Sequence, residues 1–201
     1  MSDYAEGLIE RFVAAGADFE RRLRAIGPGQ WEWPTPCAEW DVRALVNHMT
    51  RGNLNYVALV RGGTAAEFVR LRDADALGAD PPAAFARSAC ACAAAFASPG
   101  ALRRPVDHPL GRVAGEQILA VRTLDSVIHT WDLARALSAD ETLDPAQVRW
   151  AQRYLPDIYA GLGDLDRFFA PPGTAPPGAS AQDVLLHRAG RHPNGAAPAP
   201  R

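Results

Sequence analysis

Hydrophobic residues recur at helical spacing along most of the chain. In the segment from about residue 3 to residue 26, apolar positions recur at spacings of three, four and seven: Leu8, Phe12, Val13, Phe19, Leu23 and Ile26. Such spacings place these side chains on one face of a helix. A second pattern follows Asp41, a good N-cap residue, and ends at Gly62 and Gly63. Both segments are predicted to be helices that pack against a core.

Three more long segments are predicted to be helical. They run from about 81 to 97, from about 115 to 137, and from about 144 to 161. The first of them opens with two prolines and the last with an Asp-Pro pair, which are common helix starts. The residues from 103 to 112 are rich in Pro and Gly and predict a short extended hairpin. A short terminal helix is expected from 181 to 189.

The pattern predicts an all-α fold. Four main helices with mostly short connections are typical of a four-helix bundle, so residues 1–192 are expected to form a single domain. The residues from 64 to 80 are mixed and predict an irregular loop or lid. Three Trp and two Pro between 31 and 40 indicate an ordered loop. The tail from 193 to 201, made largely of Pro, Gly, Asn and Ala, is expected to be disordered.

Composition narrows the classes of partner. The net charge of the 201 residues is −2, and all 21 basic residues are Arg spread along the chain, so nucleic acid is not an expected partner. No apolar run approaches the roughly 20 residues that span a bilayer, and the N-terminus has no signal-like segment. Three cysteines do not make a disulfide framework, which favours a cytoplasmic protein. We expect a monomer or homodimer that acts on a small-molecule substrate.

Candidate chemistry lies in the fourth long helical segment. Asp125 and His129 are four residues apart and therefore share one helical face. The segment is apolar nearly all round, which predicts a central, buried helix. A carboxylate in such a helix must be paired or bound to a metal, because desolvating it alone costs several kcal/mol.

His48, late in the second helical segment, can supply a third ligand. One carboxylate and two imidazoles leave positions open on a divalent metal, as a catalytic site requires. The residues also allow a site without metal, in which Asp125 and His129 form a hydrogen-bonded pair or Arg122 holds Asp125 from one turn back.

Asp132 stands three residues after His129. It can orient the His129 imidazole from behind, act as a base, cap a neighbouring helix, or pair with Arg135. For Cys37, in the Trp-rich loop, a buried turn position is favoured over a catalytic thiol.

The remaining cysteines and one further histidine are weaker candidates. Cys90 and Cys92 point about 200° apart on a helix, so small core positions are expected for both. His108 is expected to have a surface role. The sequence contains no Gly-rich phosphate loop, nucleophile elbow or dinucleotide motif.

Three segments of the sequence resemble a known family. Residues 35–48 (TPCAEWDVRALVNH) and 122–135 (RTLDSVIHTWDLAR) resemble the signatures of actinobacterial DinB-like metal-binding proteins, which include mycothiol-dependent maleylpyruvate isomerase and mycothiol S-transferases. Residues 168–172 (FFAPP) resemble the closing motif of this group. The resemblance extends from about residue 5 to residue 192.

The resemblance implies a DinB-like up-and-down four-helix bundle with a divalent metal between helices. Zinc is the expected ion, with nickel or another divalent ion as the alternative. The positions that match the ligands of the isomerase are His48, Asp125 and His129. The isomerase has Glu where this chain has Asp125, which is one methylene shorter, so the helices must lie closer together or the metal must shift.

The resemblance also implies a function. We expect a divalent-metal-dependent enzyme that uses a low-molecular-weight thiol, mycothiol, on a small electrophilic substrate, as an S-transferase or an isomerase. The alternatives are a metal-dependent hydrolase or Lewis-acid cyclase that uses no thiol, and a non-catalytic module that binds a ligand in the bundle.

Overall fold

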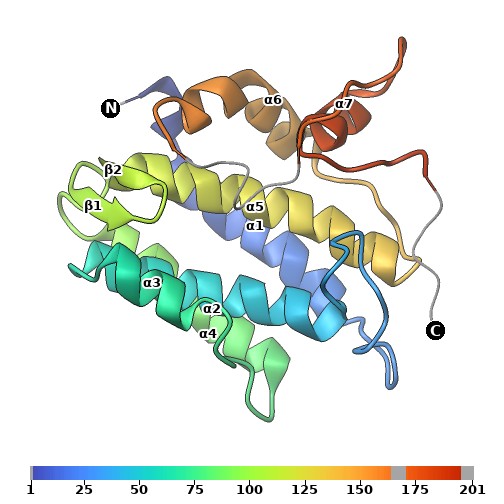
Figure 1. Cartoon of the computed structure of the whole chain (residues 1–201), viewed down its shortest axis with the longest axis horizontal. Helices are drawn as coiled ribbons and strands as arrows, with labels where there is room; N and C mark the ends of the chain where they lie inside the picture. The colour runs from blue at the N-terminus through green and yellow to red at the C-terminus, as the bar shows by residue number, and fades with distance from the viewer. Residues whose placement is uncertain (1, 164–170, 196–201) are drawn as a thin grey trace.

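The computed structural model of the chain describes residues 2–163 and 171–195 (Figure 1). Its elements are a 3-10 helix, seven α-helices and two strands within these residues: η1 (Asp3–Ala5), α1 (Leu8–Leu23), α2 (Val42–Val60), α3 (Ala65–Leu71), α4 (Pro81–Ala97), β1 (Pro105–His108), β2 (Gly111–Ala114), α5 (Gly115–Ala136), α6 (Pro145–Tyr159) and α7 (Ala181–Arg188). The described chain is therefore mostly helical, as the hydrophobic pattern predicts, and it contains the predicted hairpin and short C-terminal helix.

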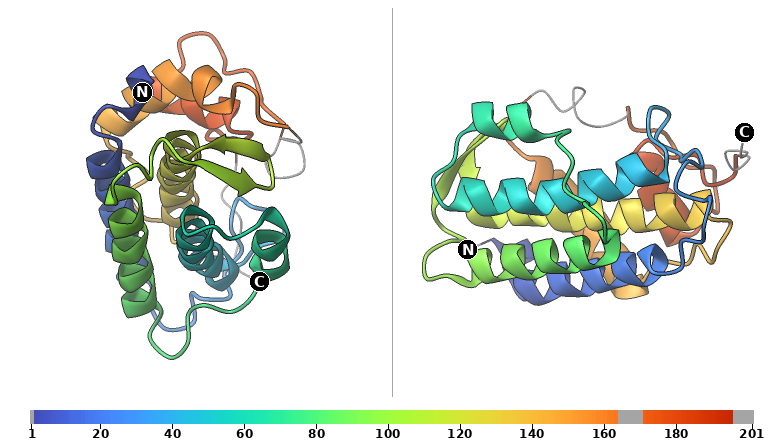
Figure 2. Two further views of the ribbon diagram at one scale, coloured as in Figure 1. Left: turned by 90° about the vertical axis from the view of Figure 1, so that its left-hand side faces the viewer. Right: turned by 90° about the horizontal axis from the view of Figure 1, so that it is seen from below.

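Four long helices lie side by side (Figures 1 and 2). Helix α1 packs against α4 and α5, and α2 packs against the same two helices. Helix α6 packs against α5, and α7 against α6. Strands β1 and β2 pair antiparallel, with Pro105 opposite Ala114 and His108 opposite Gly111, and lead directly into α5.

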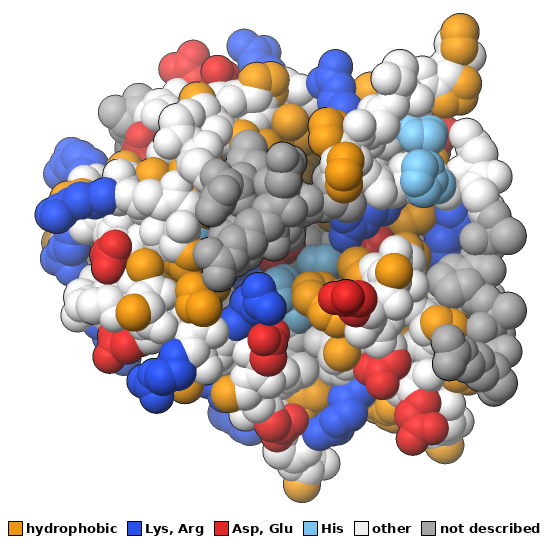
Figure 3. Space-filling view, viewed as in Figure 1, with side chains coloured by type: hydrophobic (Ala, Val, Ile, Leu, Met, Phe, Trp, Pro, Cys, Tyr) orange, Lys and Arg blue, Asp and Glu red, His pale blue; other side chains and the backbone are white. Residues whose placement is uncertain are grey.

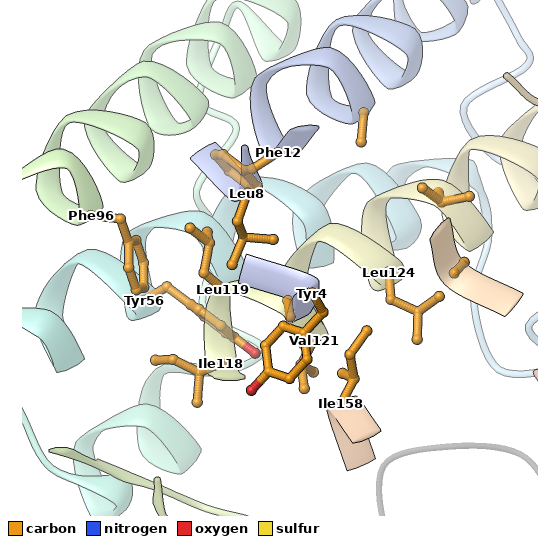
Figure 4. Close-up of a cluster of buried hydrophobic side chains, with 14 of the residues drawn as sticks. Tyr4, Leu8, Phe12, Tyr56, Phe96, Ile118, Leu119, Val121, Leu124 and Ile158 are labelled. Atoms are coloured by element: carbon orange, nitrogen blue, oxygen red, sulfur yellow. The ribbon is translucent and has the colours of Figure 1, made fainter. Parts of the chain in front are cut away.

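Helix α5 is the centre of this packing. Nearly all of its residues are buried, which agrees with its apolar character on every side. One core cluster joins its apolar side chains to those of η1, α1, α2, α4 and α6. Figure 4 shows Ile118, Leu119, Val121 and Leu124 of α5 among Tyr4, Leu8, Phe12, Tyr56, Phe96 and Ile158. Because α5 carries Asp125, His129 and Asp132, its burial fixes where these polar groups lie.

Local signals explain how the helices begin. The Asp41 carboxylate accepts a hydrogen bond from the Ala44 amide at 2.7 Å and caps α2, as predicted. Asp80 and Asp144 cap α4 and α6 in the same way, each followed by Pro in the first turn. The Asp41 cap sets where α2, the helix that carries His48, begins.

Three expectations were wrong. The residues from 64 to 80 contain helix α3, which Thr64 and Glu67 start with a capping box.

His108 is buried rather than at the surface, because the hairpin lays its ring against Tyr56 and Phe68 at centroid distances of 5.6 and 5.2 Å. Cys90 is exposed on α4, although Cys92 is in the core as expected.

Several predictions fall outside the described residues or are not tested by them. The FFAPP segment begins at residues 168–170, and the predicted tail ends with residues 196–201; both stretches lie outside the described part. The single domain from 1 to 192 stays a prediction. Within the described residues, no helix combines the length and apolar character needed to cross a membrane.

Two glycines provide a matched test of the packing. A Cβ at Gly115, the first residue of α5, would lie 2.2 Å from the Ala101 carbonyl oxygen, whereas a Cβ at Gly16 in α1 would meet nothing within 4 Å. Gly115→Ala is expected to lower the free energy of unfolding by roughly 1–3 kcal/mol through overpacking. Gly16→Ala is expected to raise it by roughly 0.4–1 kcal/mol through reduced entropy of the unfolded chain. Urea denaturation measures both, and equal effects of the two substitutions would contradict this packing.

Candidate metal centre

Helices α2 and α5 bring His48, Asp125 and His129 together. The His48 Nε2 lies 3.2 Å from Asp125 Oδ2, and the His129 Nε2 lies 3.1 Å from Asp125 Oδ1. The potential ligand atoms of the three side chains all lie within 4.8 Å of one another. The structure therefore gathers the three residues that the sequence proposes as ligands, although His48 is 77 positions from Asp125.

The spacing of these atoms fits a divalent cation. Zinc bonds nitrogen and oxygen at about 2.0–2.1 Å in a tetrahedral site, which puts neighbouring ligand atoms about 3.3 Å apart. The distances from His129 Nε2 to Asp125 Oδ1, 3.1 Å, and from His48 Nε2 to Asp125 Oδ2, 3.2 Å, are close to that separation, and they are also hydrogen-bond lengths. Imidazole and carboxylate ligands suit zinc, and imidazole also suits nickel. Three protein ligands leave at least one coordination position open.

The site is accessible from one side. The side chain of His48 is 26% exposed and that of Asp125 is 18% exposed, whereas His129 is buried. Figure 3 shows histidine side chains at a hollow near the centre of one face of the molecule. A small molecule can therefore approach the His48 and Asp125 side of the cluster.

The Trp-rich loop covers part of the site. The Trp40 ring lies against His48 at a centroid distance of 4.6 Å and against His129 at 5.7 Å. The loop is ordered, as predicted, because the Thr35 hydroxyl donates to the Trp40 carbonyl at 2.8 Å and Pro34 forms a β-bridge with Asp41. Trp40 restricts how the two imidazole rings can turn.

Arg122 holds the Asp125 carboxylate from the interior. Its side chain is almost fully buried and donates to Asp125 Oδ2, to the Met49 carbonyl and, at 2.9 Å, to Asn53 Oδ1. The Arg122–Asp125 pair that the sequence offered as an alternative is thus present, together with the geometry of a cation site. Gly52 makes room for the guanidinium, since a Cβ there would lie 2.8 Å from Arg122 Cζ.

Asp132 lies behind His129. Its Oδ2 is 2.8 Å from His129 Nδ1, and its side chain is fully buried. Arg191, which sequence reasoning missed, donates from Nε to Asp132 Oδ1 at 3.1 Å and from Nη2 to Oδ2 at 2.7 Å. Arg135 does not pair with Asp132 but with Glu141, at 3.1 Å. No helix N-terminus among the described elements is capped by Asp132.

Cys37, His129 and Asp132 form a second group of potential ligand atoms within 4.8 Å of one another. The Cys37 thiol lies 3.5 Å from Asp132 Oδ2 and 3.4 Å from Arg191 Nη2. The Arg191 guanidinium donates to both Asp132 oxygens, whereas Arg122 donates to Oδ2 of Asp125 alone and leaves Oδ1 without a guanidinium contact among the described residues. The group of His48, Asp125 and His129 is therefore the better cation site. No local sequence signal predicts the Cys37–Arg191 contact, which joins residues 154 positions apart.

The three candidate ligands titrate as a coupled set. Burial lowers the pKa of His48 from its usual value. Burial opposes the shifts of Asp125 and His129, but their mutual attraction overrides it: the pKa of Asp125 is well below its usual value, and the pKa of His129 is well above its own. Burial likewise opposes the shift of Asp132, whose pKa Arg191 and His129 lower. Both carboxylates are therefore charged at neutral pH.

Gly52 tests the packing beneath Asp125. In Gly52→Ala, the new Cβ displaces the Arg122 guanidinium, and we expect the free energy of unfolding to fall by roughly 1–3 kcal/mol. Urea denaturation provides the measurement, with Gly16→Ala as the control at an uncrowded helical glycine. A Gly52→Ala protein as stable as the wild type would mean that Arg122 is not confined as the structure shows.

The raised pKa of His129 gives the metal-free protein a defined pH dependence. The folded state holds this proton more tightly than the unfolded state, whose pKa is near 6.5. The stabilisation is thus fully present below pH 6.5 and is lost as pH rises through the raised pKa. With a chelator present, the free energy of unfolding is expected to fall above pH 6.5 by at most about 1.4 kcal/mol per pH unit. His129→Gln should remove this slope, and an unchanged slope would assign it to other groups.

Comparison with known proteins identifies the family. Residues 12–134 match the family model of the mycothiol maleylpyruvate isomerase N-terminal domain. Two relatives, both described as uncharacterized proteins of Mycobacterium tuberculosis and each from a different strain, are 33% identical over 134 residues, which is 63% of this chain and 65% of each relative. The chain thus matches less than two thirds of the length of these relatives. No solved structure matches it. By its match over residues 12–134, the chain belongs to the mycothiol maleylpyruvate isomerase N-terminal domain family, a DinB-like family of actinobacteria.

Proposed function

We propose that the protein is a divalent-metal-dependent enzyme that uses mycothiol on a small electrophilic substrate, as an S-transferase or an isomerase. The observation that carries this proposal is the meeting of two imidazole nitrogens with one carboxylate at 3.1 and 3.2 Å, at an accessible position on a buried helix. Family membership supports mycothiol as the thiol and an up-and-down DinB-like bundle as the arrangement of the four long helices.

The side chains of the site have separate tasks in this proposal. His48, Asp125 and His129 bind the cation, for which zinc is the first candidate and nickel the second. When bound, the cation supplies a position at which a thiol is held as the thiolate at neutral pH. Arg122 keeps Asp125 in place, and Asp132 accepts a hydrogen bond from His129 Nδ1–H, which keeps the proton on Nδ1 and leaves Nε2 to bind the cation.

The two reactions share one bond-forming step. The thiolate would attack an electrophilic carbon of the substrate and form an S–C bond. In a transferase, a leaving group such as halide would depart with the electron pair of its bond to that carbon, and the S–C bond would stay in the product. In an isomerase, the π pair of a conjugated double bond would move onto the activating carbonyl, the resulting single bond would rotate, and the returning pair would expel the thiolate unchanged. Trp40 lies against both imidazole rings and lines this side of the site.

The position of Asp132 argues against its use as the base of a hydrolase. A hydrolase that relies on a protein base needs one that reaches water in the open position, and Asp132 is the candidate that the sequence suggested. This carboxylate is fully buried, faces the Nδ1 side of His129 and is occupied by Arg191. We therefore assign Asp132 to the orientation of His129.

Metal-dependent consumption of thiol tests the proposal. The purified protein is loaded with one equivalent of zinc and supplied with mycothiol and a set of electrophiles that includes maleylpyruvate and an aryl halide. We expect loss of thiol or isomerised product, and no turnover after chelation. His48→Ala is expected to weaken zinc binding by more than about 100-fold, since even residues behind the ligands contribute 10–100-fold.

The exposed His192 supplies the control. His192→Ala is expected to keep both zinc affinity and turnover. Turnover that persists without thiol would favour the hydrolase alternative. A protein that binds no divalent metal, or whose affinity His48→Ala leaves unchanged, would contradict the proposed centre.

A further inference from the structure

Arg191 joins the C-terminal segment to the candidate metal centre. It lies after α7 and outside residues 12–134, the part that matches the family model. Its guanidinium nevertheless reaches Asp132, 59 positions earlier in the chain, through two hydrogen bonds of 3.1 and 2.7 Å. The side chains of α2 and α5 alone therefore do not complete the surroundings of His129.

The contact fixes the orientation of the Asp132 carboxylate. A planar guanidinium that donates from two nitrogens to two carboxylate oxygens holds the carboxylate in one plane. Asp132 is fully buried, and such a carboxylate needs a paired positive charge. The Cys37 thiol adds a weaker contact to Oδ2 at 3.5 Å. With Arg191 in place, Oδ2 is held 2.8 Å from His129 Nδ1.

The orientation of the Asp132 carboxylate determines how the His129 ring is held, and thereby where its Nε2 points. A hydrogen bond from Nδ1 to Asp132 keeps the proton on that nitrogen and restrains the ring. The opposite nitrogen, Nε2, then faces Asp125 Oδ1 at 3.1 Å. The chain of contacts from Arg191 through Asp132 to His129 therefore ends at a candidate ligand atom.

The segment that carries Arg191 is itself held firmly. The Arg191 backbone amide donates to the Leu186 carbonyl at 2.8 Å. The Nη1 of the Arg191 side chain donates to the Ala189 carbonyl at 2.8 Å. Leu186 is fully buried in the core. From α5, Arg135 donates to the carbonyls of His192 and Pro193 at 3.0 and 2.7 Å. The Arg191 side chain is thus anchored on both sides before it reaches Asp132.

We propose that Arg191 is a positioning residue of the metal centre: by clamping Asp132 it holds His129 in the orientation that binds the cation. The inference rests on the proposed function for the identity of the site, but the contacts that carry it involve only side chains of this chain. The C-terminal segment that carries Arg191, which lies beyond the family match, would therefore take part in metal binding.

Zinc affinity in four proteins tests the inference: the wild type, Arg191→Met, Arg191→Lys and the control Arg188→Met. Arg188 is exposed at the end of α7, so its substitution makes the same chemical change nearby without touching Asp132. Competition with a chromophoric chelator is expected to show about 10–100-fold weaker zinc binding in Arg191→Met. Arg191→Lys should recover part of the loss, and Arg188→Met should match the wild type.

Two spectroscopic readouts distinguish positioning from general stability. The visible spectrum of the cobalt-loaded protein should change in Arg191→Met, because the His129 ligand is no longer held. In the metal-free protein, the proton NMR signal of His129 Nδ1–H should be downfield and slow to exchange in the wild type and in Arg188→Met. In Arg191→Met this signal should broaden or disappear, while thermal melts followed by circular dichroism verify that the protein is folded.

The outcomes separate the two proposals. If the wild type binds no metal, the proposed function fails, and the Nδ1–H signal still decides whether Arg191 positions His129. If Arg191→Met binds zinc as tightly as the wild type and keeps the signal, the inference is overturned while the metal centre stands. If Arg191→Met does not fold, Arg191→Lys decides, because it keeps the charge but loses the two-point contact. Affinity and signal equal to those of the wild type in that variant would overturn the inference.

Discussion

The charge of Asp125 inside the central helix is the constraint on which the rest of the site depends. Helix α5 is buried along nearly its whole length, so this carboxylate has to be compensated where it stands. Arg122 approaches from the interior, and His48 and His129 approach from the accessible side. The packing of α2 on α5 that closes the core is therefore also the packing that sets the distances between the candidate ligands.

Much of this arrangement could be predicted from the sequence because it is periodic or local. The hydrophobic spacing indicated the long helices, and Asp41, a good N-cap residue, indicated the start of α2. The interval of four residues between Asp125 and His129, on a helix that is apolar all round, predicted that the two groups share one face of a buried helix; His129 is buried and Asp125 is partly exposed. A buried polar pair needs partners, and His48 was the histidine of another long helix that could provide one.

The rest depends on contacts that no short segment specifies. Arg191 and Cys37 meet Asp132 only because the C-terminal segment and the Trp-rich loop fold onto the same end of α5. The burial of His108 depends on how the hairpin lies over α2 and α3, which hydrophobic spacing does not determine. Helix α3 is a different case: its capping box at Thr64 was present in the sequence, but seven helical residues give too short a pattern to outweigh the polar residues that follow.

The decisive experiment is a crystal structure of the zinc-loaded protein, with anomalous data collected at the zinc edge. We expect one anomalous peak, bonded to His48 Nε2, the Asp125 carboxylate and His129 Nε2, with Asp132 still on His129 Nδ1. A peak at Cys37 and Asp132 instead, or no peak within bonding distance of His48 and Asp125, would contradict this expectation.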